Sequence, residues 1–131
     1  MAVTTGLNHL GLAVQDLTQT TAFFTDVLGF DEIGRDNNYP RTTVTDGNVR
    51  LTLWQTDPAA IAFDRRSNIG LHHLALTIPS EAALLEIAAK LAKTPGVTIA
   101  FMPELVGDGP RKHMMLHEPG GIRIELVWPG V

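Results

Sequence analysis

An internal repeat is the feature that most constrains how this chain can fold. The segment His9–Val14 reads His-Leu-Gly-Leu-Ala-Val, and the segment His73–Ile78 reads His-Leu-Ala-Leu-Thr-Ile. Both segments alternate aliphatic residues with small or polar ones, which is the pattern of a β-strand with one buried face. A repeated unit with one apolar face cannot bury that face alone. The two copies must therefore pack together or against a partner chain.

A helical pattern follows each of these strands. It covers about residues 18–28 in the first copy and about residues 81–93 in the second, with apolar side chains spaced to form one stripe. Asp16 or Thr18 can cap the first helix and Ser80 the second, because their side-chain oxygens accept hydrogen bonds from the free N–H groups of a first helical turn. Each copy thus continues from a strand into a helix.

A second matching strand closes each half of the chain. Gly47–Trp54 and Gly120–Val127 align on their glycines, and this alignment places Thr52 at the position of Glu125. Both strands again alternate apolar and polar residues. Each half is therefore a strand–helix–strand–strand–strand unit.

This organisation predicts an α+β fold of two βαβββ modules, each with one covering helix. The modules span residues 7–55 and 70–128, and residues 56–69 link them. A chain of 131 residues is long enough for one well-packed core and too short for two independent domains. We therefore expect residues 1–131 to form a single domain.

Composition excludes several classes of function. The chain contains no cysteine, which rules out disulfides, thiolate catalysis and zinc–sulfur sites. Its net charge of −4, with no cluster of lysine and arginine, argues against nucleic acid or a membrane as partner. Residues 1–6 lack the pattern of a signal peptide, and no apolar stretch approaches the roughly 20 residues of a membrane span. We expect a cytoplasmic protein whose partner is a small molecule.

Strand alternation places three metal-binding side chains on one predicted face. His9, His73 and Glu125 share the face opposite the apolar core, whereas His72 is expected to point away from it. Two imidazoles and one carboxylate suit a divalent ion with open positions, Fe(II) or Mn(II) above all, with Ni(II) or Zn(II) also able to bind. Taken singly, each histidine also fits a structural role, and Glu125 fits a solvated surface carboxylate.

Other residues on this face are candidates for catalysis and substrate binding. His113 lies on a predicted strand, on the same side as Glu125, and can act as a general acid or base because histidine titrates near neutral pH. Arg50 could contact an anion, and Trp54 could form an aromatic wall. A rim histidine, a surface arginine and a packing tryptophan are the alternative interpretations.

Four segments resemble the vicinal oxygen chelate superfamily, which includes glyoxalase I, extradiol dioxygenases, fosfomycin-resistance thiol transferases and bleomycin-binding proteins. The segments are Asn8–Leu17, Phe23–Phe30, His72–Leu76 and Glu118–Glu125. The resemblance implies that the two modules form a cupped, incomplete barrel around a metal ion, usually in a dimer. It also implies that His9, His73 and Glu125 are the metal ligands.

Two positions and one loop depart from the patterns of particular members. Glyoxalase I uses a fourth ligand, a glutamate, where this chain has Thr52. Extradiol dioxygenases and fosfomycin enzymes commonly carry a tyrosine where this chain has Met115. The serine-rich potassium loop of the fosfomycin enzymes is absent from Leu105–Lys112. Thr52 and Met115 are therefore expected to contact the substrate together with Arg50 and Trp54.

Three functions follow from these observations. The first is a divalent-metal enzyme that binds vicinal oxygens of its substrate, with extradiol ring cleavage as the preferred reaction. The second keeps the metal but catalyses isomerisation or a glutathione-type addition. The third is a metal-free protein that sequesters a small molecule. For all three a homodimer is expected, whose modules pair within one chain or are swapped between two.

Overall fold

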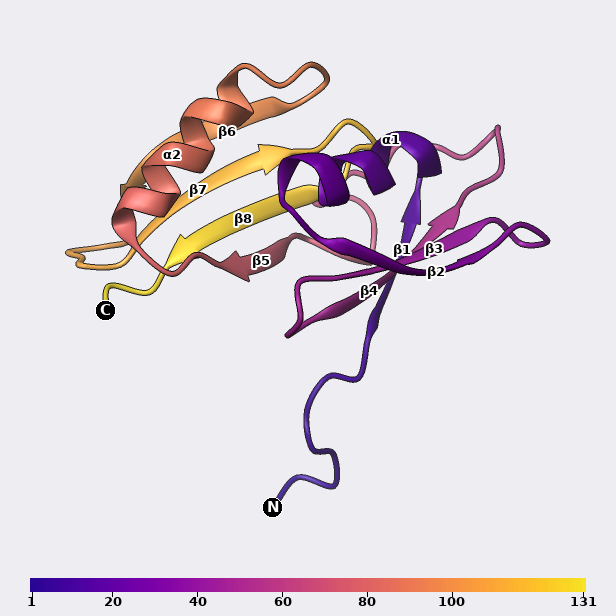
Figure 1. Ribbon diagram of the computed structural model, residues 1–131, viewed down its shortest axis with the longest axis horizontal. Helices are drawn as coiled ribbons and strands as arrows, with labels where there is room; N and C mark the ends of the chain where they lie inside the picture. Colours follow the sequence, from indigo (N-terminus) through magenta and orange to yellow (C-terminus); the bar gives the residue numbers. More distant parts are fainter. The chain divides into compact units, whose positions relative to one another are not determined.

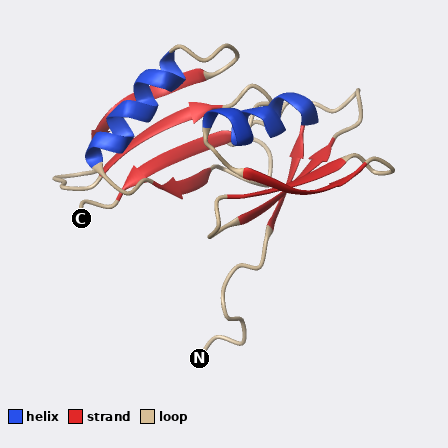
Figure 2. Cartoon of the chain, viewed as in Figure 1, coloured by secondary structure: helices blue, strands red, loops and turns tan.

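The computed structural model describes all 131 residues. They form two compact units, Met1–Ala60 and Ile61–Val131. Each unit holds one four-stranded sheet and the helical segment that follows its first strand (Figures 1 and 2). None of the helices has the length and apolar character needed to cross a bilayer.

Unit 1 follows the predicted order of elements. Its sheet has the order β1-β4-β3-β2, with β1 parallel to β4 and the remaining pairs antiparallel. The elements are β1 (Leu10–Val14), α1 (Leu17–Ala22), the π-helical segment η1 (Phe23–Val27), β2 (Asp31–Asp36), β3 (Arg41–Thr45) and β4 (Arg50–Gln55).

Unit 2 repeats the same topology. Its sheet has the order β5-β8-β7-β6, again with one parallel pair, β5 and β8. The elements are β5 (Leu74–Thr77), α2 (Glu81–Ala92), β6 (Thr98–Leu105), β7 (Lys112–His117) and β8 (Arg123–Trp128). The predicted α+β fold with two βαβββ modules is confirmed, and neither sheet closes on itself.

The register confirms that the two closing strands are equivalent. In unit 1, Thr52 of β4 pairs with Gly11 of β1. In unit 2, Glu125 of β8 pairs with Ala75 of β5. Thr52 and Glu125 thus occupy the same place in the two sheets, each beside a residue with little or no side chain.

Both helices begin where the sequence predicts, but the first one ends differently. Asp16 caps α1 by accepting a hydrogen bond from the Gln19 backbone N–H at 3.0 Å. The helical stretch predicted for about residues 18–28 is confirmed, but its last turns form the π-helical segment η1, in which the Leu28 N–H is bonded to the Phe23 carbonyl at 3.2 Å. Phe23 and Phe24 are both buried, so η1 places two successive aromatic rings in the core.

Each sheet buries one face under its own helix. Alternation correctly predicts the buried residues Leu12, Val14, Leu51, Leu53, Leu74, Leu76, Ile124 and Leu126, whereas β3 and β7 each bury three successive residues, 42–44 and 114–116. In unit 2, α2 contributes Leu84, Ala88 and Leu91 to the same core. The opposite face of each sheet carries the candidate site residues.

Candidate functional site

Glu125 is the centre of a histidine–carboxylate cluster in unit 2. Its Oε1 lies 3.4 Å from Nε2 of His73, and its Oε2 lies 2.5 Å from Nδ1 of His113. The Glu125 side chain is only 17% exposed, so water screens these contacts weakly. One carboxylate therefore has an imidazole beside each of its two oxygens.

The fold explains why these side chains meet. Glu125 lies on β8, between β5 and β7, and is directly opposite Met115 of β7. His113 is two residues before Met115 on β7 and shares its face. His73 immediately precedes β5, two residues before the partner of Glu125 in the parallel ladder. Two neighbouring strands and the segment before a third thus direct their side chains to one place.

The expectation that His72 points away from His73 is wrong. Nδ1 of His72 lies 2.8 Å from Nδ1 of His73, and the two rings meet edge to face with centroids 5.0 Å apart. Strand alternation does not apply to this pair, because β5 begins only at Leu74 and both histidines lie in the irregular segment before it.

Arg123 determines which nitrogen of each ring carries a proton. Its Nη1 lies 3.2 Å from Nδ1 of His72, and a guanidinium can only donate hydrogen bonds. Nδ1 of His72 therefore accepts, and Nδ1–H of His73 must donate to it. Partial desolvation and the positive charge of Arg123 lower the pKa of His72, which disfavours protonation of this ring. A neutral His73 then carries its lone pair on Nε2.

This lone pair faces the Glu125 carboxylate, and that arrangement fits a metal ion. Two acceptor atoms 3.4 Å apart repel one another unless a cation lies between them. Imidazole nitrogen and carboxylate oxygen each bind Zn²⁺-like ions at about 2.0–2.2 Å, so both atoms can reach one ion from these positions. Within either unit, no group of three His, Asp or Glu side chains is arranged to hold a metal ion by itself. A metal ion bound by His73 and Glu125 would therefore need a further ligand.

His113 is placed to transfer protons beside this pair. Its Nδ1–H donates to Glu125, which leaves Nε2 as the atom that can take up or release a proton. Nε2 lies 3.9 Å from Oε1 of Glu104 on β6, and the ring of Phe101 packs against the imidazole with centroids 4.8 Å apart. Sequence reasoning missed Glu104, and strand parity could not have placed it opposite His113, because the register of β6 and β7 shifts between Phe101 and Glu104.

His9 belongs to unit 1, where it immediately precedes β1. It is exposed, and its Nδ1 lies 2.8 Å from Oδ1 of Asn8. Because a carbonyl oxygen only accepts, Nδ1 of His9 donates and its Nε2 carries the lone pair. His9 and His73 thus present the same nitrogen, in the form that binds a metal.

The other predicted residues differ in accessibility. Thr52 accepts a hydrogen bond from Nε1 of Trp54 at 3.1 Å, and both side chains are half-buried on the open face of β4. Arg50 is exposed at the start of that strand. Met115 is 5% exposed, so its side chain is largely covered by its neighbours. Sequence reasoning missed Arg41, which pairs with Trp54 across β3 and β4.

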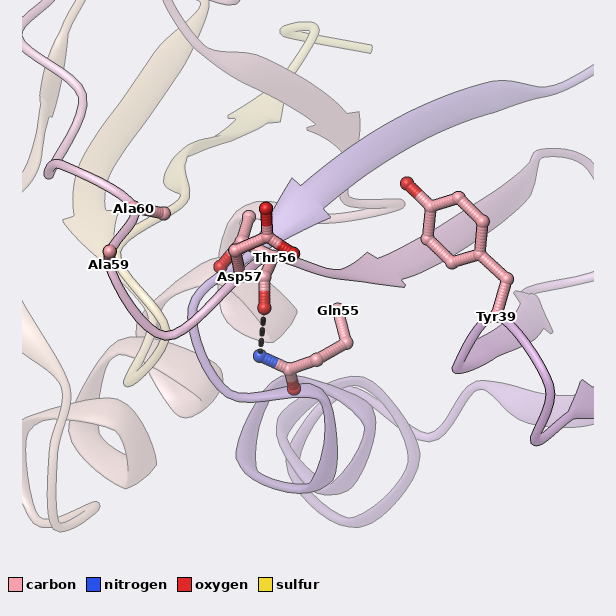
Figure 3. A pocket seen from close by; sticks show the side chains of 6 residues that line it. All are labelled: Tyr39, Gln55, Thr56, Asp57, Ala59 and Ala60. Carbon is pink, nitrogen blue, oxygen red and sulfur yellow. Dashed lines mark hydrogen bonds between the residues drawn. The ribbon is translucent and has the colours of Figure 1, made fainter.

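A separate pocket lies at the far end of β4 in unit 1 (Figure 3). It has a volume of about 420 Å³ and is lined by Tyr39, Gln55, Thr56, Asp57, Ala59 and Ala60, none of which is a predicted site residue. The Gln55 amide is already occupied, since it donates to the carbonyls of Gln15 and Thr56 and accepts from the Leu17 N–H. The Gln55 amide is therefore not free to bind a ligand in this pocket, which shares no residue with the histidine–carboxylate cluster.

Comparison with known proteins places this geometry in context. A family model described as "Glyoxalase/Bleomycin resistance protein/Dioxygenase superfamily" matches residues 6–126. A curated relative, named catechol-2,3-dioxygenase, from Bacillus subtilis (strain 168), is 25% identical over 122 residues. The alignment covers 93% of this chain and 41% of that protein, so the chain spans about two-fifths of the relative's length.

Solved structures share the fold over nearly the whole chain. A glyoxylase/bleomycin resistance protein/dioxygenase domain from Frankia sp. EAN1pec superposes with a TM-score of 0.82 at 22% identity, covering 96% of this chain and 93% of that one. Lactoylglutathione lyase from Agrobacterium tumefaciens gives a TM-score of 0.74 at 15% identity, covering 97% and 96%. These identities support a common fold without indicating a common reaction. Because the family match covers almost all of its residues, the chain belongs to the Glyoxalase/Bleomycin resistance protein/Dioxygenase superfamily.

Proposed function

We propose that this chain is a divalent-metal-dependent enzyme that binds a small substrate through two neighbouring oxygens. The observation that carries the proposal is the lone pair of His73 Nε2 facing the Glu125 carboxylate at 3.4 Å. His73 and Glu125 would be two ligands and His9, related to His73 by the repeat, the third. His9 would come from the same chain or from a second copy in a homodimer. Sedimentation of the metal-loaded protein in the analytical ultracentrifuge would distinguish a monomer from a dimer.

The proposed donor set indicates the kind of ion and its role. Two imidazole nitrogens and one carboxylate oxygen favour Fe(II) or Mn(II), and Ni(II) or Zn(II) can also bind such a set. When bound, a divalent ion supplies a Lewis acid that polarises the substrate oxygens. The protein's part is to hold the substrate, to fix the ligands and to move protons.

The reaction we propose is oxygen-dependent ring cleavage of a catechol-like compound. In this reaction one ring C–C bond beside a hydroxylated carbon breaks, and both atoms of O₂ enter the product, so no further reductant is needed. Nε2 of His113 would take a proton from a substrate hydroxyl, while Glu125 holds the imidazole in place by accepting a hydrogen bond from its Nδ1–H. The Glu104 carboxylate, 3.9 Å away, would stabilise the imidazolium that forms.

Support for ring cleavage over isomerisation comes from Thr52. The isomerase alternative needs a basic group at this position, but the Thr52 hydroxyl has no basic character and already accepts the Trp54 N–H bond. The curated relative named catechol-2,3-dioxygenase points the same way. Arg50, Thr52, Trp54 and Met115 remain the proposed substrate contacts.

Two measurements on the purified chain test the proposal. We expect metal analysis of protein prepared without chelators, then reconstituted with Fe(II), to give close to one equivalent of metal per site. We also expect oxygen consumption with catechols and none of the isomerase activity assayed with methylglyoxal and glutathione. Failure to retain any transition metal after reconstitution would refute metal dependence, and turnover of methylglyoxal instead of catechols would refute ring cleavage.

Replacing His72 is expected to weaken metal binding although this residue is not a proposed ligand. His72 accepts the Nδ1–H bond of His73 and thereby keeps the lone pair on Nε2. Loss of such an outer partner lowers metal affinity by about 10–100-fold. We expect that drop for His72→Ala and a much smaller one for His72→Asn, which keeps an acceptor near the same place. Equal affinities for Mn(II) in the wild type and His72→Ala, measured by calorimetry, would contradict the role.

A further inference from the structure

The open face of the unit 1 sheet carries an arginine without a counter-ion. Arg41, at the start of β3, is half-buried and lies opposite Trp54 of β4. Its guanidinium carbon is 5.5 Å from the centre of the Trp54 ring, and its Nη1 donates to Oγ1 of Thr43 at 2.7 Å. These two contacts fix the guanidinium in place on the sheet.

No carboxylate pairs with Arg41. The nearest cross-strand acid is Asp36 on β2, but Asp36 forms no ion pair, and its Oδ1 accepts from the Asn38 backbone N–H at 2.9 Å. Arg35, on the same strand as Asp36, shows the contrast, because it donates two hydrogen bonds to Glu32, at 2.8 and 3.0 Å. The five N–H groups of Arg41 are thus largely available to an incoming anion.

The residues beside Arg41 on the open face of the sheet have small side chains or none. One cross-strand row contains Gly11, Thr52, Thr43 and Gly34, so that glycine stands on both outer strands. A Cβ at Gly34 would lie 3.8 Å from Nη1 of Arg41, and one at Gly11 would lie 3.2 Å from Oγ1 of Thr52. The absence of these side chains leaves the guanidinium and the threonine hydroxyls open to a ligand lying on the sheet.

Trp54 is itself held rigidly. Its Nε1–H is bonded to Thr52, and the ring of Tyr39 packs edge-on against it, with centroids 4.7 Å apart. A guanidinium resting on a fixed aromatic ring loses little conformational entropy when it binds an anion. The planar fork of Arg41 matches a carboxylate better than a single-point anion, because both carboxylate oxygens can be bonded at once.

We propose that Arg41, positioned by Trp54 and Thr43, forms a subsite for the carboxylate of an aromatic substrate. The inference rests on the proposed function, because it takes the ligand to be the substrate of that reaction. It restricts this substrate to catechols that carry a carboxylate. Arg41 then determines specificity, since uncharged catechols lack the group that it binds.

The test uses two probes that differ only in the carboxylate, 3,4-dihydroxybenzoate and catechol. Dissociation constants are measured by anaerobic calorimetry on the full chain, with and without Mn(II). A hydrogen bond to a charged group contributes about 1.5–3 kcal/mol, which corresponds to roughly 10–150-fold in affinity. We expect wild type to bind 3,4-dihydroxybenzoate more tightly than catechol by a factor in this range. Arg41→Gln should lose the preference, and Arg41→Lys should keep part of it.

Arg35→Gln is the matched control, because it removes the same charge from a neighbouring strand of the same sheet, where the guanidinium already has an acid partner. It should bind both probes as wild type does.

A wild-type chain that does not prefer the probe with the carboxylate, or a preference that Arg41→Gln retains, would overturn the subsite. Measurement of Mn(II) binding separates the two proposals. A chain that binds no metal but prefers the carboxylate through Arg41 refutes the metal-dependent function alone, whereas normal metal binding without that preference refutes the subsite alone.

Discussion

Glu125→Gln is expected to lower the affinity for Mn(II) or Fe(II) by more than about 100-fold, since even outer partners of metal ligands contribute about 10–100-fold. The substitution keeps the size of the side chain and removes the negative charge that faces Nε2 of His73. An amide oxygen is a far weaker partner for a divalent cation than a carboxylate. Calorimetric titration of metal-free protein with each ion measures the change.

Glu104→Gln is the control for this prediction. Glu104 belongs to the same cluster, but its carboxylate is 58% exposed and approaches His113 rather than His73. We expect Glu104→Gln to bind metal as wild type does. Equal metal affinity in Glu125→Gln and wild type would show that the carboxylate is not a ligand and would remove the basis of the metal-dependent reaction. Circular dichroism establishes that both variants are folded.

The Glu125 carboxylate links two functions that are usually assigned to separate groups. Its Oε1 faces the proposed metal ligand His73, whereas its Oε2 accepts from the proposed proton carrier His113. Because the negative charge is shared between the two oxygens, a cation bound at one of them also changes the charge on the other.

The repeat and strand parity were sufficient to predict the fold and the polar face of unit 2. Alternation placed His113 on the side of Glu125, and the structure brings the two into contact at 2.5 Å. Parity works here because β7 and β8 are regular and pair over their full lengths. It failed at His72, which lies before β5 begins.

Arg41 could not be found in the same way, because β3 does not alternate in polarity. The strand reads Arg-Thr-Thr-Val-Thr, so its inward residue Thr42 looks as polar as its outward neighbours. Thr42 is nevertheless fully buried, since its hydroxyl is satisfied by Oγ1 of Thr21 at 2.8 Å. Because a buried residue of this kind is polar, the sequence of the strand does not show which of its faces is buried. The assignment of Arg41 to the open face required the register with Trp54.

His113→Gln is expected to reduce kcat for ring cleavage by about 10²–10⁴-fold, which is the usual contribution of general acid–base catalysis. A glutamine amide can still donate a hydrogen bond to Oε2 of Glu125, so the carboxylate stays in position, but it cannot carry a proton. Metal affinity should therefore remain close to that of wild type, and steady-state oxygen consumption together with metal titration measures both quantities. His117→Gln, on the same strand and opposite Arg123, is the control and should retain activity. If His113→Gln loses metal affinity and kcat in the same proportion, His113 acts by positioning Glu125 and does not transfer the proton.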